Sequence, residues 1–532
     1  MPLRDLPEPP SPWLKRLFPL CFALCLAATL LPLWIGRHLP AVDWPQHLFL
    51  IHLLDALDDP GFAFREFFVE EPGFTYLVFY YSVHFIARIF PLEIAFKIFL
   101  SLLLTGIPLS LLFLLRALKR SRWLCLLSFP MLFTYSFYWG LFSFMATIPW
   151  TFLAIGCFVH VLGDEFRTKR WALYCAGAAL SLTLLQLTHA AAMVFPALAL
   201  PAMLLLTPSD RPRRVAAVLS VVPGVALFFI WLVAGQARPP EPGSGPWQAV
   251  GSLFESRTYL FDPLAARLSR LPSHLAGGFW SYADRPALFV WLGVIALVIA
   301  LSIFRPQKPD LPLAPRLRPA ALFLLAFACY LFLPMDVKGY MYQIYPRYSQ
   351  LAALLLIAAL PFPFGKAYRI YAVAATALGL YFGINLAVQF HRFDVEAREF
   401  DAAISLIPEN SRIMHLVVDP RSRVSAHAVY LHYAALAAAR TNGVPSFSLA
   451  RHDPFPVHYR QGAHVPSPRW EWRPQQFDWK SEASWFDVYL VRGASAEKLF
   501  GKHLRHVEPV GEAGGWAVYR RRADAAPKNS SR

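Results

Sequence analysis

Long apolar stretches alternate with short polar connections along the chain up to about residue 390. Most of these stretches approach the roughly 20 residues that an α-helix needs to cross a bilayer. We therefore expect a polytopic α-helical membrane protein with about 11 to 13 transmembrane helices. The forty residues 76–115 have room for one, two or three crossings, one of them short or interfacial. The apolar stretches are 17–35, 76–90, 92–115, 123–137, 140–162, 171–188, 190–206, 215–235, 287–304, 319–334, 347–363 and 368–388.

The positions of the basic residues predict the orientation of these helices. Nineteen of the fifty Lys and Arg residues fall in the N-terminal segment and in the connections 116–122, 163–170, 207–214, 305–318 and 364–369. By the positive-inside rule these segments face the cytoplasm. The remaining loops 36–75, 236–286 and 335–346, and the block from 390, then lie outside. The first stretch is predicted to be an anchor, since Pro-rich sequence precedes it and no small-x-small cleavage site follows.

The composition agrees with a membrane protein. Hydrophobic residues make up 56% of the 532 residues and charged residues only 16%, whereas soluble proteins carry about 25% charged residues. The net charge of +16 is compatible with nucleic-acid binding in a soluble protein. Here the basic residues separate apolar stretches, so membrane topology explains much of the charge and no nucleic-acid partner is expected.

The C-terminal block has a different character from the rest of the chain. It carries twenty basic and fifteen acidic residues and alternates helical with strand-like patterns, which predicts an external α/β domain at 390–522. Residues 1–389 then form the transmembrane domain with its first external loop at 36–75, and 523–532 a disordered tail. The expected elements are a helix from 397 ending at Pro408, strands at 412–418, 487–492 and 515–521, and a helix at 425–440. All six cysteines lie in apolar stretches, so no disulfide is indicated.

Asp43 is the main candidate for chemistry, because it lies just past the first apolar stretch in PAVDWPQH. One interpretation is an N-cap, since Asp followed by a Pro in the first turn is a common helix start. The other is a general base held at the membrane interface, acting on an acceptor hydroxyl beside a lipid-borne donor. Both roles are compatible. His47 lies one turn later on the same face, either as a structural residue or as part of the site.

Other candidates lie at the same predicted membrane face. Glu70 can contribute a second carboxylate, although most acidic residues of the first loop are expected to be solvated. His189 ends an apolar stretch, which makes it either a functional residue or an anchor for a tight turn. The aromatic run 133–144 is expected to be an interfacial belt or the lining of a sugar or prenyl groove. No Asp-x-Asp pair occurs near Asp43, so no cofactor is firmly implied and a divalent metal has little support.

The loop 335–346 places basic residues on the predicted external side. Lys338, three tyrosines that include Tyr345, and then Arg347 follow one another in MDVKGYMYQIYPRYSQ. A lipid phosphate explains such cations, because Arg offers paired donors to phosphate. Snorkelling to lipid headgroups is the alternative. Three histidines of the C-terminal block lie six residues apart, which matches no usual zinc signature, and we interpret them as loop residues (His452, His458 and His464).

Together these features resemble the GT-C superfamily of membrane glycosyltransferases, which includes protein O-mannosyltransferases and bacterial lipid A aminoarabinose transferases. The resemblance rests on Asp43, the number of spans, Arg347 in YPRYSQ and the C-terminal α/β block. It implies an inverting transfer of a sugar from a polyprenyl-phosphate-linked donor to a lipid, glycan or protein acceptor, outside a bacterial inner membrane. By this resemblance Asp43 is the base, Arg347 and Lys338 stabilise the departing phosphate, and His189 assists. Unlike better-marked members, the chain has no paired acidic motif in its first loop.

Two other classes of function remain open from the sequence. A transporter or flippase is less well supported, because the few charged residues of the spans lie near span ends (Arg88, Glu93 and Lys97), whereas transporters place ionisable groups near the midplane. A non-catalytic protein that binds a lipid carrier during envelope assembly is the other alternative. Asp43 discriminates between them, since only an enzyme requires its carboxylate.

Overall fold

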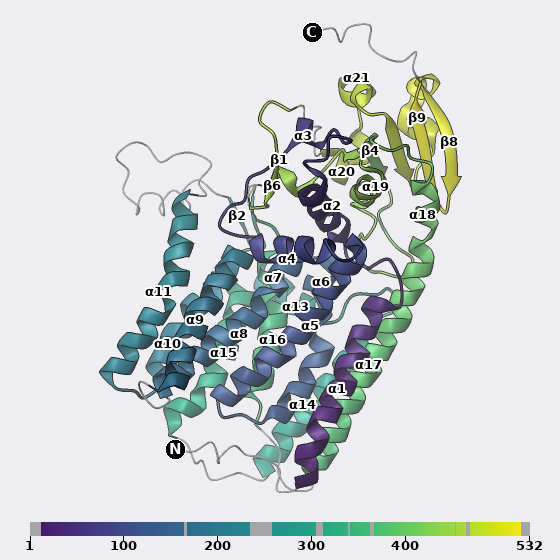
Figure 1. The fold of residues 1–532 in the computed structure, drawn as a ribbon. Coiled ribbons are helices and arrows are strands. Elements are labelled where there is room, and N and C mark those ends of the chain that lie inside the picture. Colours follow the sequence, from purple (N-terminus) through teal and green to yellow (C-terminus); the bar gives the residue numbers. More distant parts are fainter. Residues whose placement is uncertain are drawn as a thin grey trace.

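The structure is a computed structural model, shown in Figure 1. It describes residues 12–163, 168–234, 258–304, 312–338, 341–361, 367–452, 454–463 and 469–522. The predicted tail at 523–532, His464, and parts of the loops 236–286 and 335–346 lie outside the described residues, as do parts of the connections 163–170, 305–318 and 364–369.

Long apolar helices stand side by side in the lower part of Figure 1. Among the described residues, seven helical segments are long and apolar enough to cross a membrane. The chain is therefore an integral membrane protein, and its exact number of crossings remains a prediction. The helices of this bundle are α1 (Pro12–Trp34), α5 (Leu92–Ala117), α8 (Thr147–Gly163), α9 (Lys169–Thr188), α10 (Val194–Leu206), α11 (Arg211–Ala234), α14 (Arg285–Phe304), α15 (Leu313–Phe332), α16 (Ile344–Ala359) and α17 (Ala367–Ala397).

Two of the apolar stretches do not form a long helix, and the first of them is the short segment that the sequence allowed within 76–115. Residues 76–90 hold only the 11-residue helix α4 (Leu77–Ala87), too short for a ~30 Å hydrocarbon core at ~1.5 Å per residue. It lies across the top of the bundle in Figure 1. Residues 123–137 form a 3-10 helix, η1 (Arg122–Met131), and the short α6 (Tyr135–Trp139). Every residue from 123 to 133 is buried, so this stretch is apolar because protein, and not lipid, surrounds it.

The first loop forms a layer above the bundle. Its main helix α2 (Trp44–Ala56) is almost entirely buried, and α3 (Phe64–Phe67) and β1 (Phe68–Glu70) follow. Other short elements complete the loops: α7 (Phe142–Met145), η2 (Ala190–Met193), α13 (Leu264–Leu275) and the pair β2 (Tyr259–Leu260) and β3 (Asp336–Val337).

The C-terminal block contains a five-stranded mixed sheet of order β5-β4-β7-β9-β8. Strand β4 (Arg412–Val417) pairs parallel with both β5 (Val444–Pro445) and β7 (Val488–Arg492). Strand β9 (Trp516–Arg521) pairs antiparallel with both β7 and β8 (Val507–Ala513). The strands predicted at 412–418, 487–492 and 515–521 are confirmed. The helix predicted at 425–440 is wrong in its start, because α19 spans only Tyr433–Thr441. The short helices α20 (Arg469–Trp472), α21 (Trp479–Glu482) and α22 (Ala496–Phe500) lie between the later strands.

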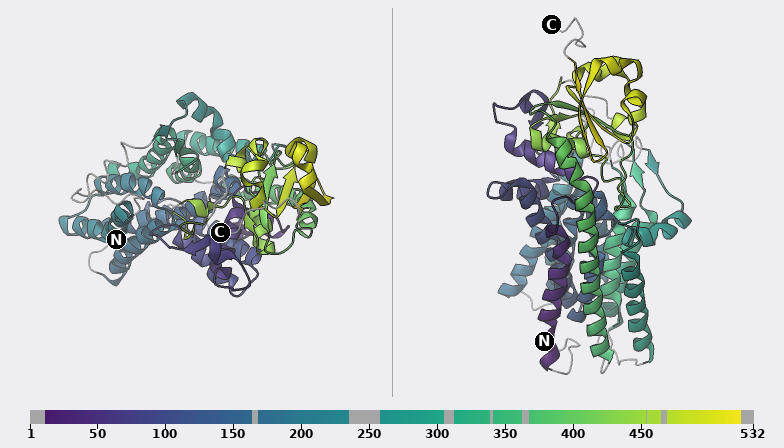
Figure 2. Two further views of the ribbon diagram at one scale, coloured as in Figure 1. Left: turned by 90° about the horizontal axis from the view of Figure 1, so that it is seen from above. Right: turned by 90° about the vertical axis from the view of Figure 1, so that its right-hand side faces the viewer.

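The sheet lies above the side of the bundle that contains α1 and α17, and α9 to α11 stand at the opposite side (Figures 1 and 2). Helix α17 crosses residue 389 and ends at Ala397, followed directly by α18 (Glu399–Ile404). Strand β6 (Val457–Tyr459) pairs antiparallel with β1 of the first loop. The C-terminal block is thus joined to the membrane part through a continuous helix and a shared two-stranded sheet.

Ion pairs reinforce this junction. Arg440 of α19 contacts Glu93 of α5 at 2.8 Å and Asp401 of α18 at 2.5 Å. Arg37 contacts Glu93 at 2.8 Å, and His38 lies 3.1 Å from Asp401. The Arg440 side chain is 15% exposed, so water screens these contacts less than those of a fully exposed pair.

Replacing Arg440 by Met should loosen the junction, because it leaves two partly buried carboxylates without this partner. We expect a loss of about 1–3 kcal/mol, between the values typical of exposed and buried pairs. Thermal unfolding in detergent and limited proteolysis of the C-terminal block measure the effect. Arg423→Met is the matched control, because the Arg423 side chain is 75% exposed in its pair with Glu399. Equal melting temperatures for the two variants would contradict a role for Arg440 at this junction.

Candidate active site

A cavity of about 150 Å³ lies where the first loop, three loop segments of the bundle and the C-terminal block meet. Its walls come from the first loop at 43–47 and 75–76, from the segments 140–144, 189–191 and 341–347, and from 449–455. These segments are far apart in the sequence, and the fold brings them together at the top of the bundle. Trp231 of α11 also lines the cavity.

Asp43 occupies the N-cap position of α2, yet its side chain makes no capping hydrogen bond. Its backbone N–H donates to the Trp139 carbonyl at 3.2 Å. The carboxylate is 22% exposed, and its Oδ1 lies 3.3 Å from Nε2 of His432. The structure therefore gives Asp43 the position of a cap but leaves its carboxylate available to the cavity and to His432.

Gly140 allows the close approach of the loop that carries Asp43. Its φ of +82° lies in the left-handed region, and a Cβ atom at this position would lie 2.9 Å from the Asp43 backbone nitrogen. The Gly140 carbonyl also accepts a hydrogen bond from Nε2 of His47 at 2.8 Å, which leaves Nδ1 to accept from the Tyr80 hydroxyl at 2.6 Å. His47 lines the cavity, but both of its nitrogens are engaged in holding the first loop.

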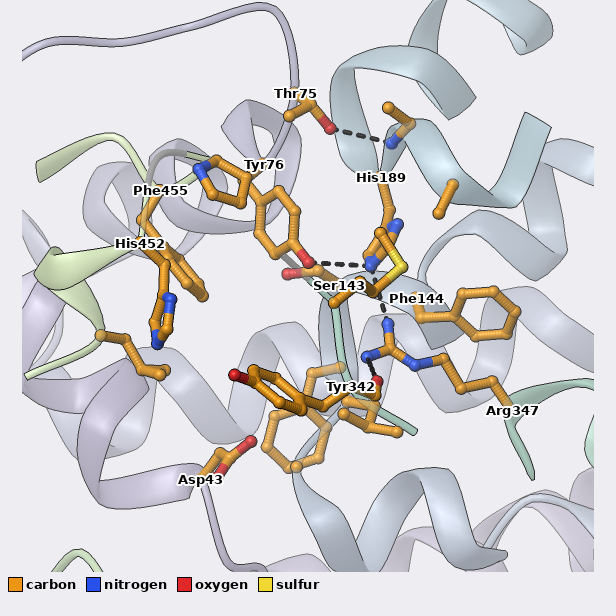
Figure 3. A pocket seen from close by; sticks show the side chains of 18 of the residues that line it. Asp43, Thr75, Tyr76, Ser143, Phe144, His189, Tyr342, Arg347, His452 and Phe455 are labelled. Carbon is orange, nitrogen blue, oxygen red and sulfur yellow. Dashed lines mark hydrogen bonds between the residues drawn. The ribbon is translucent and has the colours of Figure 1, made fainter. Parts of the chain in front are cut away.

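Arg347 and His189 meet on the other side of the cavity. Arg347 donates through Nη1 to Nε2 of His189 at 2.8 Å, and through Nε and Nη2 to the Gln343 and Tyr342 carbonyls. The Tyr76 hydroxyl lies 2.8 Å from the same His189 nitrogen. Figure 3 shows this cluster on one side of the view and the Asp43 carboxylate on the other.

The Arg347 side of the cavity carries a positive charge. Arg347 is only 6% exposed, and in the described part of the chain no carboxylate forms an ion pair with it. Burial lowers the pKa of His189 well below its usual value, and the Arg347 charge lowers it further, so this histidine is neutral. Burial raises the pKa of the Tyr76 hydroxyl. A buried guanidinium facing a cavity beside neutral partners is suited to bind an anion.

The structure places three of the predicted site residues outside the cavity lining. Glu70 is exposed on β1 and accepts a hydrogen bond from the Tyr81 hydroxyl at 2.5 Å. The Lys338 side chain is exposed. The Tyr345 hydroxyl donates to Asp262 at 2.8 Å. Asp43, His47, His189 and Arg347 are the predicted residues that the fold brings together.

Other lining residues were missed in the sequence or interpreted differently. His452, interpreted as a loop histidine, lines the cavity together with Tyr76, Tyr342 and Phe455. Ser143 and Phe144, from the predicted aromatic run, line it as well. The six-residue histidine spacing carries no signal for this position, because the site depends on the docking of the C-terminal block. Among the residues that the structure describes, no group of three or more His, Cys, Asp or Glu side chains is arranged to hold a metal ion.

Comparison with known proteins finds similarity at the level of structure. No protein-family model and no curated protein sequence matches this chain. The crystal structure of ArnT from Cupriavidus metallidurans in the apo state superimposes with a TM-score of 0.56 at 12% identity, covering 97% of this chain and 99% of that chain. The same protein bound to undecaprenyl phosphate gives a TM-score of 0.55 at 12% identity, covering 96% of this chain and 99% of that chain.

A third similar structure is the arabinofuranosyltransferase AftD from Mycobacteria, with a TM-score of 0.52 at 12% identity. The match covers 96% of this chain but only 42% of that chain. At this level of identity the similarity concerns the fold. At the level of the fold, the resemblance predicted from the sequence is thereby confirmed, because nearly the whole chain is folded like ArnT and like part of AftD.

Proposed function

We propose that the protein is an inverting glycosyltransferase that moves a sugar from a polyprenyl-phosphate-linked donor to an acceptor on the external face of a bacterial inner membrane. The observation that carries this proposal is the charge arrangement of the cavity. Arg347, a buried cation with no acidic partner among the described residues, and Asp43, a partly exposed carboxylate, line the same cavity at the top of an apolar bundle. This arrangement matches a reaction in which an anion departs as a proton is taken up.

The phosphate of the donor binds to Arg347 in this proposal. As the bond between sugar and phosphate breaks, negative charge grows on the leaving phosphate, and a preorganised guanidinium stabilises that charge. The guanidinium is held by two backbone carbonyls and His189, so it needs little reorganisation. Tyr76 lies beside the same histidine and supports its position.

Asp43 acts as the general base on the acceptor. Its carboxylate faces the cavity from the side away from Arg347 (Figure 3), as an inverting displacement requires when the acceptor attacks opposite the leaving group. The carboxylate accepts the proton of the acceptor hydroxyl while the new glycosidic bond forms.

The lipid chain of the carrier is expected to approach along α11. Trp231 of this helix lines the cavity, and its apolar neighbours Phe229, Ile230 and Val233 are exposed, as expected for a lipid-facing surface. The ArnT structure with bound undecaprenyl phosphate shows that a related fold accepts such a carrier. The acceptor, whether lipid, glycan or protein, would enter from the side of the C-terminal block.

The variant Asp43→Asn should fold normally and lose transfer. Asn fits an N-cap position as well as Asp does, but it cannot accept a proton, so the rate should fall by about 10²- to 10⁴-fold. A deletion strain complemented with each variant provides the assay, and mass spectrometry of cell-envelope glycans identifies the product that the deletion removes. Asp58→Asn is the control, because the Asp58 side chain is 87% exposed. Full glycan transfer by Asp43→Asn would favour a carrier-binding or transport protein instead.

The variant Arg347→Gln should weaken both phosphate binding and transfer. Loss of one preorganised group at a developing charge typically lowers kcat by about 10²- to 10³-fold. Binding of undecaprenyl phosphate to the purified protein measures the ground-state part of the effect, and complementation measures transfer. Lys338→Gln tests the other predicted phosphate ligand and should behave as wild type, because Lys338 does not line the cavity. A larger defect in Lys338→Gln than in Arg347→Gln would reverse this assignment.

A further inference from the structure

A row of buried ionisable side chains stands behind Asp43 and belongs entirely to the C-terminal block. His432, directly before α19, places Nε2 3.3 Å from the Asp43 carboxylate and Nδ1 2.7 Å from the Glu471 carboxylate. The other Glu471 oxygen lies 3.3 Å from Nδ1 of His415 on β4. The order is therefore Asp43, His432, Glu471, His415.

These groups are shielded from water. The side chains of His415, His432 and Glu471 are 0%, 4% and 2% exposed. The His432 ring also stacks on Phe447 at 5.6 Å. Nothing in the proposed transfer reaction uses these three residues, yet burying charged groups is costly unless each is paired. A functional role would explain why these three ionisable side chains are buried together.

The two carboxylates that face the ring nitrogens of His432 indicate its protonation state. Ionised carboxylates only accept hydrogen bonds, so an imidazole that faces one at each nitrogen donates from both and carries a positive charge. Burial alone would lower the pKa of His432, but hydrogen bonds to Asp43 and Glu471 raise it to about 9. The other ionisable groups around it are His47 of α2 and, through Glu471, His415 of β4. Although burial opposes this, His415 and His432 hold the pKa of Glu471 below its usual value.

We propose that His432, held by Glu471, is a positioning residue that orients the carboxylate of Asp43 for the reaction. The Nε2–H group binds Oδ1, which leaves Oδ2 to receive the proton of the acceptor. Glu471 has a second effect, because its charge balances that of the imidazolium. Asp43 then keeps the net negative charge that a base needs, instead of being neutralised within a simple ion pair.

This arrangement makes the C-terminal block part of the active site. Asp43 comes from the first loop and its support from α19, α20 and β4, so the base is correctly oriented only when the block is docked. The inference rests on the proposed function, since it assigns a role to residues that act through Asp43.

The double variant His432→Gln with Glu471→Gln tests the inference without leaving a single buried charge. Misplaced catalytic groups lose about 10²-fold in rate at most for a shift of ~1 Å, so we expect transfer to fall about 10- to 100-fold. The melting temperature of the double variant in detergent should stay close to that of wild type, because the two buried charges are removed together. Binding of undecaprenyl phosphate should stay within about twofold of wild type, since Arg347 is untouched. Glu471→Gln alone should give a smaller loss of transfer.

The control is His458→Gln, which changes a histidine of β6 in the same block and should leave transfer and melting temperature unchanged. A double variant with wild-type transfer, alongside an inactive Asp43→Asn, would overturn the role of His432 while the proposed function stands. Full transfer by Asp43→Asn would instead overturn the proposed function itself. A loss of transfer in the double variant together with a lower melting temperature or an equal loss of undecaprenyl phosphate binding would indicate a purely structural role and would also overturn the inference.

Discussion

The docking of the C-terminal block onto the first loop is the constraint on which the site depends. The contact involves backbone pairing of β1 with β6 and buried Gln46, and the ion pair of Arg440 with Glu93 ties the same block to α5. Gln46 donates to the Phe447 carbonyl at 3.2 Å and accepts from the Leu449 amide at 3.1 Å. Because these bonds lie within one helical turn of Asp43, they fix the loop and its catalytic candidate together. The same contact brings His452 and Phe455 to the cavity wall.

The membrane part supplies the rigid frame for the other half of the cavity. His189 and Arg347 lie at the junction of α9 with η2 and in the first turn of α16. Positions at helix ends can bear polar groups at the membrane boundary while the rest of each helix remains apolar. The proposed anion site therefore lies where apolar helices end, and the proposed base, Asp43, belongs to the loop layer immediately above.

The sequence predicted those candidate site residues that lie next to the end of an apolar stretch. Asp43, His189 and Arg347 each follow or begin an apolar stretch, so a local pattern was sufficient to select these three residues, which line one cavity in the fold. Glu70 was also predicted for the site, but it lies at the exposed end of β1, where its carboxylate accepts a hydrogen bond from the Tyr81 hydroxyl. Hydropathy likewise predicted a span at 123–137, because burial within protein and burial in lipid produce the same apolar pattern.

His432 and Glu471 could not be predicted, since both lie several hundred residues after Asp43 in the sequence. The segment around His432 reads as a continuous helix in sequence, yet the helix begins only at Tyr433. The irregular backbone before α19 is what allows the His432 ring to face the first loop. Contacts of this kind depend on how two domains pack, and no local periodicity reports that packing.

The two sides of the cavity differ in whether their charged group has a partner in the protein, and this difference fits the proposed reaction. Arg347 has no carboxylate partner among the described residues, and in the proposed reaction the phosphate of the donor supplies the missing negative charge. Asp43 instead has permanent support from His432, whose own charge Glu471 balances. A phosphate leaves after each reaction, whereas a base must be restored unchanged. In the proposed reaction, the Arg347 side therefore binds a phosphate that arrives and leaves in each cycle, whereas the Asp43 side must return to the same ionised carboxylate.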